Sequence, residues 1–275
     1  MRTLFRMKAM DIPEGRLAAD FAAVRRSGPL VHNITNYVAM NYSANVLYAL
    51  GARPLMSSET SEMEEIVDAS DALVINVGCI GRSQFEAMLS AAGRARATGR
   101  PWVLDPAGVG LSAFRTDACH ELVGDFAPAV IRGNAAEISA LAGVPARQRG
   151  MDSPETPADG IESAMRLSAR TGAVVCMSGA VDCITDGRRL VRIADGSPLM
   201  GRVTAMGCSA SAAIAAFLAV ESDALAAAAC AMGVMGLAGR KAEAVSAGPG
   251  SFAVNFLDAL SNLDPAETER ELRYE

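Results

Sequence analysis

The stretch Val203-Thr204-Ala205-Met206-Gly207-Cys208-Ser209 carries mostly small side chains, and the uncharged residues 210–220 follow it. This pattern predicts a tight turn that opens a helix. The first backbone N–H groups of a helix have no partners within the helix, and the helix dipole adds positive charge there. Because small side chains let an anion approach, the turn is a candidate phosphate site. Taken alone, the stretch favours the alternative of an ordinary buried, alanine-rich helix.

The rest of the chain alternates between short apolar runs and longer helical patterns. Strands without strict alternation are predicted at 72–77, 102–104, 129–131 and 173–177. Helices are predicted at 83–98, 113–124, 135–142 and 161–171. Alternating strands and helices predict an α/β protein with a mostly parallel sheet and crossover helices. Residues 182–185 and 189–193, around Asp186-Gly187, predict a hairpin at one edge of the sheet.

Polar or glycine-rich segments follow four of the predicted strands. They are Asn76–Gly81, Asp105–Gly110, Arg132–Glu137 and Ser178–Ala180. In open α/β sheets, ligands bind beyond the carboxyl ends of the strands. A single segment of this kind means little, since every strand ends in a turn. Four such segments that meet at one rim predict a binding site.

Composition limits the classes of protein that the chain can belong to. Its 275 residues are 51% hydrophobic and carry a formal net charge of -6, without a Lys/Arg block. This size suits one large α/β domain or two small ones, and the charge argues against a nucleic-acid partner. The six cysteines include no C-x-x-C pair, which argues against a metal cluster or a disulfide framework. Free thiols and the absence of a signal peptide predict a cytoplasmic protein.

A single domain is predicted over residues 1–275. We expect an N-terminal extension at 1–12, a surface excursion at 145–160 and a charged tail at 264–275. The uncharged runs 203–220 and 224–239 approach the length of a membrane helix. They consist mostly of Ala, Gly, Ser and Met, so helices buried in a layered protein are the preferred interpretation, and no membrane partner is expected.

Several motifs together carry a resemblance to a known family. They are, in chain order, Pro29–Val38, Asn41–Asn45, Gly51–Met56, Asp105-Pro106, Ile131–Ile138, Ser178-Gly179, Val203–Cys208 and Gly248–Phe252. In this order they resemble the hydroxyethylthiazole kinases of thiamine salvage, a branch of the ribokinase-like fold. The resemblance implies a three-layer sandwich with a mostly parallel central sheet flanked by helices. It also implies ATP-dependent phosphorylation of the hydroxyethyl group of 4-methyl-5-(2-hydroxyethyl)thiazole, with Mg²⁺, in a homotrimer whose active sites lie between subunits.

The resemblance assigns a catalytic role to Cys208, where related sugar kinases have an aspartate base. A cysteine at a helix N-terminus is expected to have a lowered pKa, so it could orient or deprotonate the substrate hydroxyl. The alternative is a small residue tolerated in a tight turn. Ala205 stands where the family more often has glycine, near the substrate, and Met206 is bulkier than the usual alanine. A negative φ at Ala205 would still allow close approach.

The resemblance implies that Arg132, Ser178, Thr204 and Gly207 bind ATP. A planar guanidinium suits bidentate phosphate binding, and a serine hydroxyl can donate one hydrogen bond. The alternative for Arg132 is a surface arginine.

Two acidic residues match family positions that are associated with magnesium. They are Asp105 and Glu137. Mg²⁺ binds oxygen ligands and often takes only one or two carboxylates. The alternatives are a turn former before Pro106 for Asp105 and an exposed helical charge for Glu137.

The thiazole pocket is expected to include Met56, Asn36 and Ala205. A thioether suits a sulfur-containing aromatic ring, although Met56 could equally be an ordinary core methionine. A polar cluster of His32, Asn33, Thr35 and Asn36 is expected at the head of a helix, where Asn33 or Thr35 could be the cap. Asn36 and Asn41 could instead border the thiazole site, and His32 is left outside the catalytic set.

The implied mechanism is direct in-line phosphoryl transfer, with the backbone N–H groups of 205–208 neutralising charge on the phosphate. Two rival functions remain at this point. One is another ribokinase-like activity, such as a hydroxymethylpyrimidine kinase, a sugar kinase or an ADP-forming hydrate dehydratase. The other is a thiazole- or nucleotide-binding module without catalysis.

Overall fold

The computed structural model describes residues 8–144 and 157–275. Its centre is a nine-stranded sheet in the order β1-β9-β8-β7-β6-β5-β4-β2-β3. The strands are β1 (Lys8–Ala9), β2 (Leu30–Ile34), β3 (Arg53–Met56), β4 (Ala72–Asn76), β5 (Trp102–Asp105), β6 (Val130–Asn134), β7 (Val174–Ser178), β8 (Asp182–Thr185) and β9 (Arg189–Ile193). All neighbouring pairs are parallel except the two that β8 makes.

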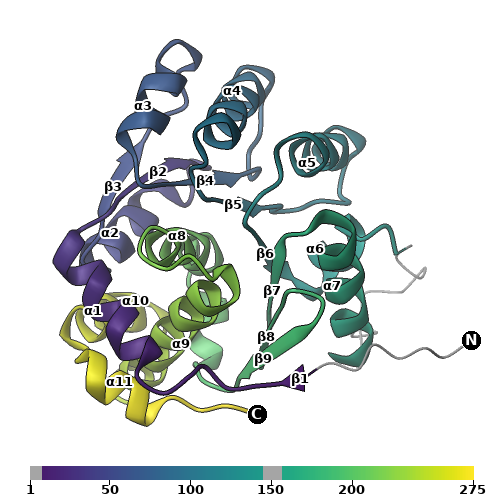
Figure 1. The fold of residues 1–275 in the computed structure, drawn as a ribbon. Helices are drawn as coiled ribbons and strands as arrows, with labels where there is room; N and C mark the ends of the chain where they lie inside the picture. The colour runs from purple at the N-terminus through teal and green to yellow at the C-terminus, as the bar shows by residue number, and fades with distance from the viewer. Residues whose placement is uncertain (1–7, 145–156) are drawn as a thin grey trace, which may run out of the picture.

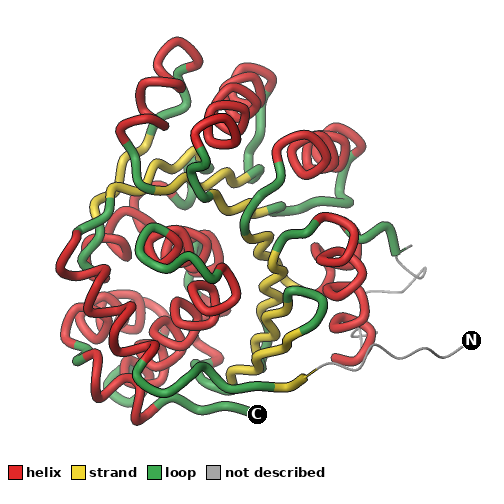
Figure 2. The backbone as a smooth tube through the Cα atoms, in the orientation of Figure 1, coloured by secondary structure: helices red, strands yellow, loops and turns green. Residues whose placement is uncertain are grey.

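Helices cover both faces of this sheet (Figures 1 and 2). They are α1 (Arg16–Ser27), α2 (Met40–Leu50), α3 (Met63–Ala69), α4 (Arg82–Thr98), α5 (Ala113–Phe126), α6 (Ala135–Leu141), α7 (Pro157–Thr171), α8 (Met206–Leu218), α9 (Ala224–Glu243), α10 (Pro249–Asn262) and α11 (Pro265–Glu271). Two short 3₁₀ helices, η1 (Thr60–Glu62) and η2 (Pro198–Arg202), complete the set of described helices.

The sheet separates two apolar cores. Val74 and Val103 face the core formed with α1, α2, α8, α9 and α10. Their neighbours Leu73, Ile75 and Leu104 face the core formed with α3 to α7. Every residue of β4 and β5 is therefore buried on one face or the other, which explains why these strands lack polar alternation.

The predicted strands and helices are confirmed in position, but the carboxyl ends of three strands were placed too early. β5, β6 and β7 extend to Asp105, Asn134 and Ser178. In the sheet register Asn76 lies opposite Asp105, and Asn134 lies opposite Ser178. Residues predicted as loops are therefore the last residues of strands, which fixes their backbones in the sheet.

The N-terminal end of the chain departs from the prediction. Lys8 and Ala9, expected in an extension, pair with β9, so β1 and not the predicted hairpin forms this edge of the sheet. The predicted tail contains α11, and Tyr274 bridges to Ile193. Most of the predicted excursion, residues 145–156, lies outside the described residues, and its last residues belong to α7.

Strand β2 was missed, because its polar residues indicate a helix start. His32 and Asn33 are strand residues, and the expected cap by Asn33 or Thr35 is wrong, since Ala39 caps α2 without a side-chain bond. Asn36 instead organises this turn, because its Oδ1 accepts hydrogen bonds from the backbone N–H groups of Val38 and Ala39.

The predicted turn and helix at 203–220 form as expected. α8 begins at Met206, and every residue from Ser209 to Leu218 is buried. α8 and α9 pack together inside one core, which accounts for their small, uncharged residues. No helix of the described part of the chain has the length and apolar character needed to cross a bilayer.

The backbone of Ala205 does not meet the condition of a negative φ. Ala205, the residue before α8, has φ +71°, in the left-handed region. A residue with a Cβ atom is strained there by about 1–2 kcal/mol, and glycine is not.

We therefore expect Ala205→Gly to raise the free energy of unfolding by about 1 kcal/mol, because relief of strain outweighs the added freedom of the unfolded chain. Urea unfolding measures the change. Ala210→Gly, inside α8, is the matched control and is expected to lose about 1 kcal/mol, as glycine does in helices. Equal losses of unfolding free energy in the two variants would contradict the strain at Ala205.

Burial makes His32 a source of pH-dependent stability. His32 is fully buried, its Nε2 lies 3.1 Å from the Ser57 carbonyl oxygen, and burial lowers its pKa from 6.5 to about 4. Between these values the unfolded chain binds a proton that the native chain does not, so stability falls as pH decreases from 6.5 to 4. We expect the free energy of unfolding to fall by about 2–3 kcal/mol less over this pH range in His32→Gln than in the wild type. Urea unfolding at pH 7 and pH 4 measures it, and identical pH dependence in both proteins would contradict the assignment.

Candidate active site

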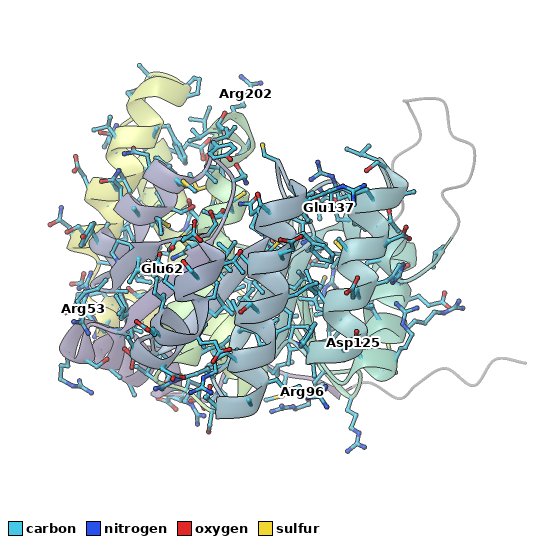
Figure 3. All side chains as sticks on the ribbon, turned by 90° about the horizontal axis from the view of Figure 1, so that it is seen from above. Arg53, Glu62, Arg96, Asp125, Glu137 and Arg202 are labelled. Atoms are coloured by element: carbon cyan, nitrogen blue, oxygen red, sulfur yellow. The ribbon has the colours of Figure 1, made fainter. Side chains whose placement is uncertain are left out.

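The carboxyl ends of the central strands open into a cavity of about 760 Å³. It lies between the ends of β5, β6 and β7, the η2 segment, the first turn of α8 and one side of α9. The convergence predicted for the strand-end segments is confirmed for those after β5, β6 and β7, all of which line this cavity. In Figure 3, Glu137 and Arg202 lie toward one side of the molecule, and Arg96 and Asp125 lie toward the opposite side.

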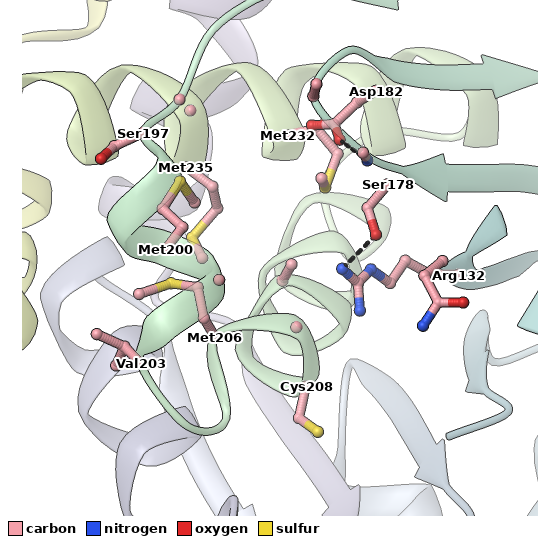
Figure 4. A pocket seen from close by; sticks show the side chains of 18 of the residues that line it. Arg132, Ser178, Asp182, Ser197, Met200, Val203, Met206, Cys208, Met232 and Met235 are labelled. Atoms are coloured by element: carbon pink, nitrogen blue, oxygen red, sulfur yellow. Dashed lines mark hydrogen bonds between the residues drawn. The ribbon is translucent and has the colours of Figure 1, made fainter. Parts of the chain in front are cut away.

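One wall of the cavity is polar. The Arg132 Nη2 donates a 2.7 Å hydrogen bond to the Ser178 Oγ, and the Gly179 N–H donates one of 3.0 Å to Asp182 (Figure 4). Asp182 is 8% exposed, and burial raises its pKa to about 6. No sequence pattern singles out Asp182, which stands at the start of the hairpin strand β8.

Arg132 lies directly against the start of α8. A Cβ atom at Gly207 would lie 2.7 Å from the Arg132 Nη1, so only glycine leaves room for the guanidinium there. The Arg132 Nε is buried without a hydrogen-bond partner. A permanent cation and a helix N-terminus thus face the same space, an arrangement that attracts phosphate.

The other wall is apolar and rich in sulfur. It is formed by Met200, Val203, Met206, Met232 and Met235. Sequence reasoning missed this wall because its methionines come from η2, α8 and α9, and nothing local distinguishes them from core methionines. Flexible thioethers of this kind suit a flat aromatic ligand.

Cys208 lies at the floor of the cavity in the first turn of α8. Its Sγ lies 3.2 Å from the Asn76 Nδ2 and 3.6 Å from the Asn36 Nδ2. The predicted lowering of its pKa is wrong: burial and the nearby Asp105 charge raise the pKa of Cys208 to about 11. The group is a neutral thiol at pH 7, because loss of solvent outweighs the helix dipole.

The two predicted acidic residues both line the cavity, in different settings. Asp105 is 2% exposed and its Oδ2 accepts a 2.8 Å hydrogen bond from Ser211, so it is no ordinary turn former. Burial raises the pKa of Asp105, the Arg132 charge opposes this rise, and the Glu137 charge adds to it. Glu137 is no free helical charge either: its oxygens accept from the N–H groups of Gly108 and Asn134, completing a capping box.

The donor chemistry of the cavity fits a hydrated Mg²⁺ ion. The described residues contain no cluster of three His, Cys, Asp or Glu side chains able to hold a metal. Mg²⁺ does not require one, since it commonly takes one or two carboxylates plus water and phosphate oxygens. The residues that line the cavity include four aspartate or glutamate side chains and one arginine. One of the four carboxylates, Asp195, is paired with Arg240, which does not line the cavity. This excess of negative charge favours a divalent cation and disfavours a bare polyphosphate.

Three predicted residues are not among those that line this cavity: Asn36, Met56 and Thr204. Thr204 is exposed to solvent. Met56 ends β3, three strands from β5, which is about 14 Å at the usual strand spacing. Asn36 is nearer, since it contacts Cys208. Asn41 is exposed on α2, where it bonds Asn45.

Over most of its length the chain is similar to known proteins. The model of the family described as "Hydroxyethylthiazole kinase family" matches residues 21–266. A hydroxyethylthiazole kinase of Syntrophus aciditrophicus is 46% identical over 95% of this chain and 97% of its own length. The solved structure of a hydroxyethylthiazole kinase protein from Pyrococcus horikoshii has a TM-score of 0.87 at 36% identity, covering 94% of this chain and 98% of that one.

A ribokinase-like superfamily protein from Enterococcus faecalis shares the fold, with a TM-score of 0.60 at 16% identity over 94% of this chain and 98% of that one. The predicted fold, a ribokinase-like sandwich with a mostly parallel central sheet, is therefore confirmed. From the family match over most of its length and from the cavity with Arg132 and Cys208 at the start of α8, the chain belongs to the hydroxyethylthiazole kinase family.

Proposed function

We propose that this protein transfers the terminal phosphoryl group of ATP to the hydroxyl of 4-methyl-5-(2-hydroxyethyl)thiazole, in thiamine salvage. The observation that carries the proposal is the position of the Arg132 guanidinium over Gly207, beside the backbone N–H groups that open α8. The residues of the cavity come from one sheet and its helices, so the proposal treats residues 1–275 as a single kinase domain.

The two walls of the cavity suit the two parts of a nucleotide. The methionine wall accepts the aromatic base, and the polar wall with Arg132 and Ser178 accepts the phosphates. The terminal phosphate then lies against the backbone of residues 205–208, where fixed N–H groups neutralise the charge of the transferring group. Thr204 precedes this turn and is exposed to solvent, so it would contact a phosphate only from the solvent side of the turn.

Cys208 acts as a neutral thiol that positions the acceptor hydroxyl. A thiol whose pKa is raised to about 11 is not an effective base at pH 7. Phosphoryl transfer tolerates this, because its transition state depends mainly on alignment and charge neutralisation. No covalent intermediate on Cys208 is required.

Asp105 and Glu137 would hold Mg²⁺ on the cavity side of β5 and α6. When bound, the ion supplies charge neutralisation on the phosphate oxygens. Ser211 keeps the Asp105 carboxylate in place, and the N–H groups of Gly108 and Asn134 fix the Glu137 carboxylate.

The thiazole ring is assigned to the side of Cys208 where β2 and β3 end. Asn36 reaches the Cys208 sulfur, and Ala205 and Met56 would complete this part of the site. Tyr37 and Val38, next to Asn36, are 78% and 62% exposed. Such apolar exposure beside a site supports the proposal of a homotrimer in which the neighbouring subunit covers it. The six free cysteines support a reducing, cytoplasmic location.

A coupled assay of ADP release tests the proposed activity. We expect ADP release with ATP, the hydroxyethylthiazole and Mg²⁺, and a loss of at least about tenfold when the ion is chelated. Hydroxymethylpyrimidine and ribose are the control acceptors. Release with a control acceptor alone would assign another kinase activity, and thermal stabilisation by thiazole without any ADP would indicate a binding module.

Arg132→Ala and Cys208→Ala are expected to affect different kinetic constants. Loss of a charged hydrogen bond to phosphate should raise the KM for ATP about 10–100-fold in Arg132→Ala. Loss of alignment at the acceptor should lower kcat about 10–100-fold in Cys208→Ala, with the KM for ATP changed less than about threefold. Steady-state kinetics with varied ATP measure both. Wild-type constants in either variant would rule out its assigned role.

A further inference from the structure

Asn76, the last residue of β4, is a buried amide that the proposed mechanism has not used. It is 0% exposed, and its Nδ2 lies 3.2 Å from the Cys208 Sγ. A fully buried amide is expected to have its donors and acceptors satisfied, so its partners define what it does.

The orientation of the Asn76 amide is fixed by its other contacts. Its Oδ1 accepts hydrogen bonds of 2.9 Å from the Asn36 Nδ2 and of 2.9 Å from the Gly78 N–H. A flipped amide would place its NH₂ against these two donors, which buries unpaired groups. The backbone of Gly78 also packs closely, since a Cβ there would lie 2.9 Å from the Asn76 Oδ1. The Asn76 Nδ2 must therefore face the sulfur, on the same side as the Asp105 carboxylate, to which Asn76 also hydrogen-bonds.

The second amide is fixed in the same way. The Asn36 Oδ1 accepts from the backbone N–H groups of Val38 and Ala39, each at 3.1 Å, which directs its Nδ2 toward Asn76 and Cys208. The Cys208 sulfur thus receives N–H donors from two sides and acts as a hydrogen-bond acceptor. Its own S–H hydrogen is used by neither amide and is left for the cavity that Cys208 lines.

We infer that Asn76 is a positioning residue for the kinase reaction, which holds the Cys208 sulfur through a donated N–H bond and so presents the thiol to the acceptor alcohol. The inference deepens the proposed function and rests on it. Asn76 itself lies beneath Cys208 and lines no part of the cavity, so it acts through the sulfur and not by touching the nucleotide.

Asn76→Asp is the sharpest variant, because it keeps the shape of the side chain and an oxygen for the Asn36 and Gly78 donors. It replaces with an oxygen the NH₂ that faces Cys208, and it also removes the hydrogen bond to Asp105, which Asn76→Leu removes without adding a charge. We expect kcat to fall about 10–100-fold, as for a misplaced reacting group, with the KM for ATP changed less than about twofold. Asn76→Leu, of similar size and without charge, is a second variant and is expected to lower kcat in the same direction.

Asn33→Asp is the matched control. Asn33 is 1% exposed on the neighbouring strand β2, and its Nδ2 donates to the Val31 carbonyl instead of Cys208. It introduces the same buried carboxyl, and its kcat should stay within about threefold of the wild-type value. Equal losses of kcat in Asn33→Asp and Asn76→Asp would show that any buried carboxyl group here lowers activity, and they would overturn the inference.

A double-mutant cycle tests whether Asn76 acts through the sulfur. In a Cys208→Ala background, Asn76→Asp is expected to change kcat by less than about twofold, since residues that act as a unit are not additive. A full 10–100-fold loss in that background would show that Asn76 acts independently of Cys208 and would contradict the inference.

The contact can also be measured without substrate, which separates this inference from the proposed activity. Iodoacetamide alkylation at Cys208, followed by peptide mapping, should be at least about tenfold slower in Asn76→Asp than in the wild type, because a donor is replaced by a carboxyl group. Asn33→Asp should react like the wild type. Unchanged alkylation of Cys208 in both Asn76 variants would overturn the inference, even if kinase activity were absent.

Discussion

The arrangement of the site depends on one close approach, that of the Arg132 guanidinium to the first turn of α8. Gly207 permits it, because any side chain there would collide with the Arg132 Nη1. Arg132 is held from the other side by Ser178, on the next strand of the sheet. The sheet register therefore fixes a permanent cation at a helix N-terminus, two features that each attract an anion and here act on one space.

The same burial that builds the site determines its protonation. Cys208 and Asp105 line the cavity and have raised pKa values, because desolvation penalises their charged forms. A helix N-terminus favours a thiolate, but here the dipole is outweighed by the loss of water and by the Asp105 charge. The chemistry that fits is positional: a neutral thiol, fixed amides and backbone donors around a transferring phosphoryl group.

Much of the fold could be predicted from the sequence, because buried parallel strands leave continuous apolar runs such as 72–75 and 102–104. Strand β2 could not, since His32 and Asn33 are polar yet buried, and their burial results from the neighbouring strands β3 and β4. The motif residues of the site, Arg132 and Cys208, were predicted correctly as neighbours of one cavity. The methionine wall, Asp182 and Asn76 depend on contacts between elements far apart in the chain, for which no local pattern exists. The positive φ of Ala205 was hidden for a similar reason, because a tight turn imposed it on a residue that rarely adopts it.

A crystal structure with a non-hydrolysable ATP analogue, Mg²⁺ and the thiazole alcohol tests the account most directly. We expect the terminal phosphate within about 3 Å of the backbone N–H groups of Gly207 and Cys208, with Arg132 bonded to the phosphate chain. A nucleotide whose phosphates lie away from the start of α8, with Arg132 still bonded only to Ser178, would contradict it.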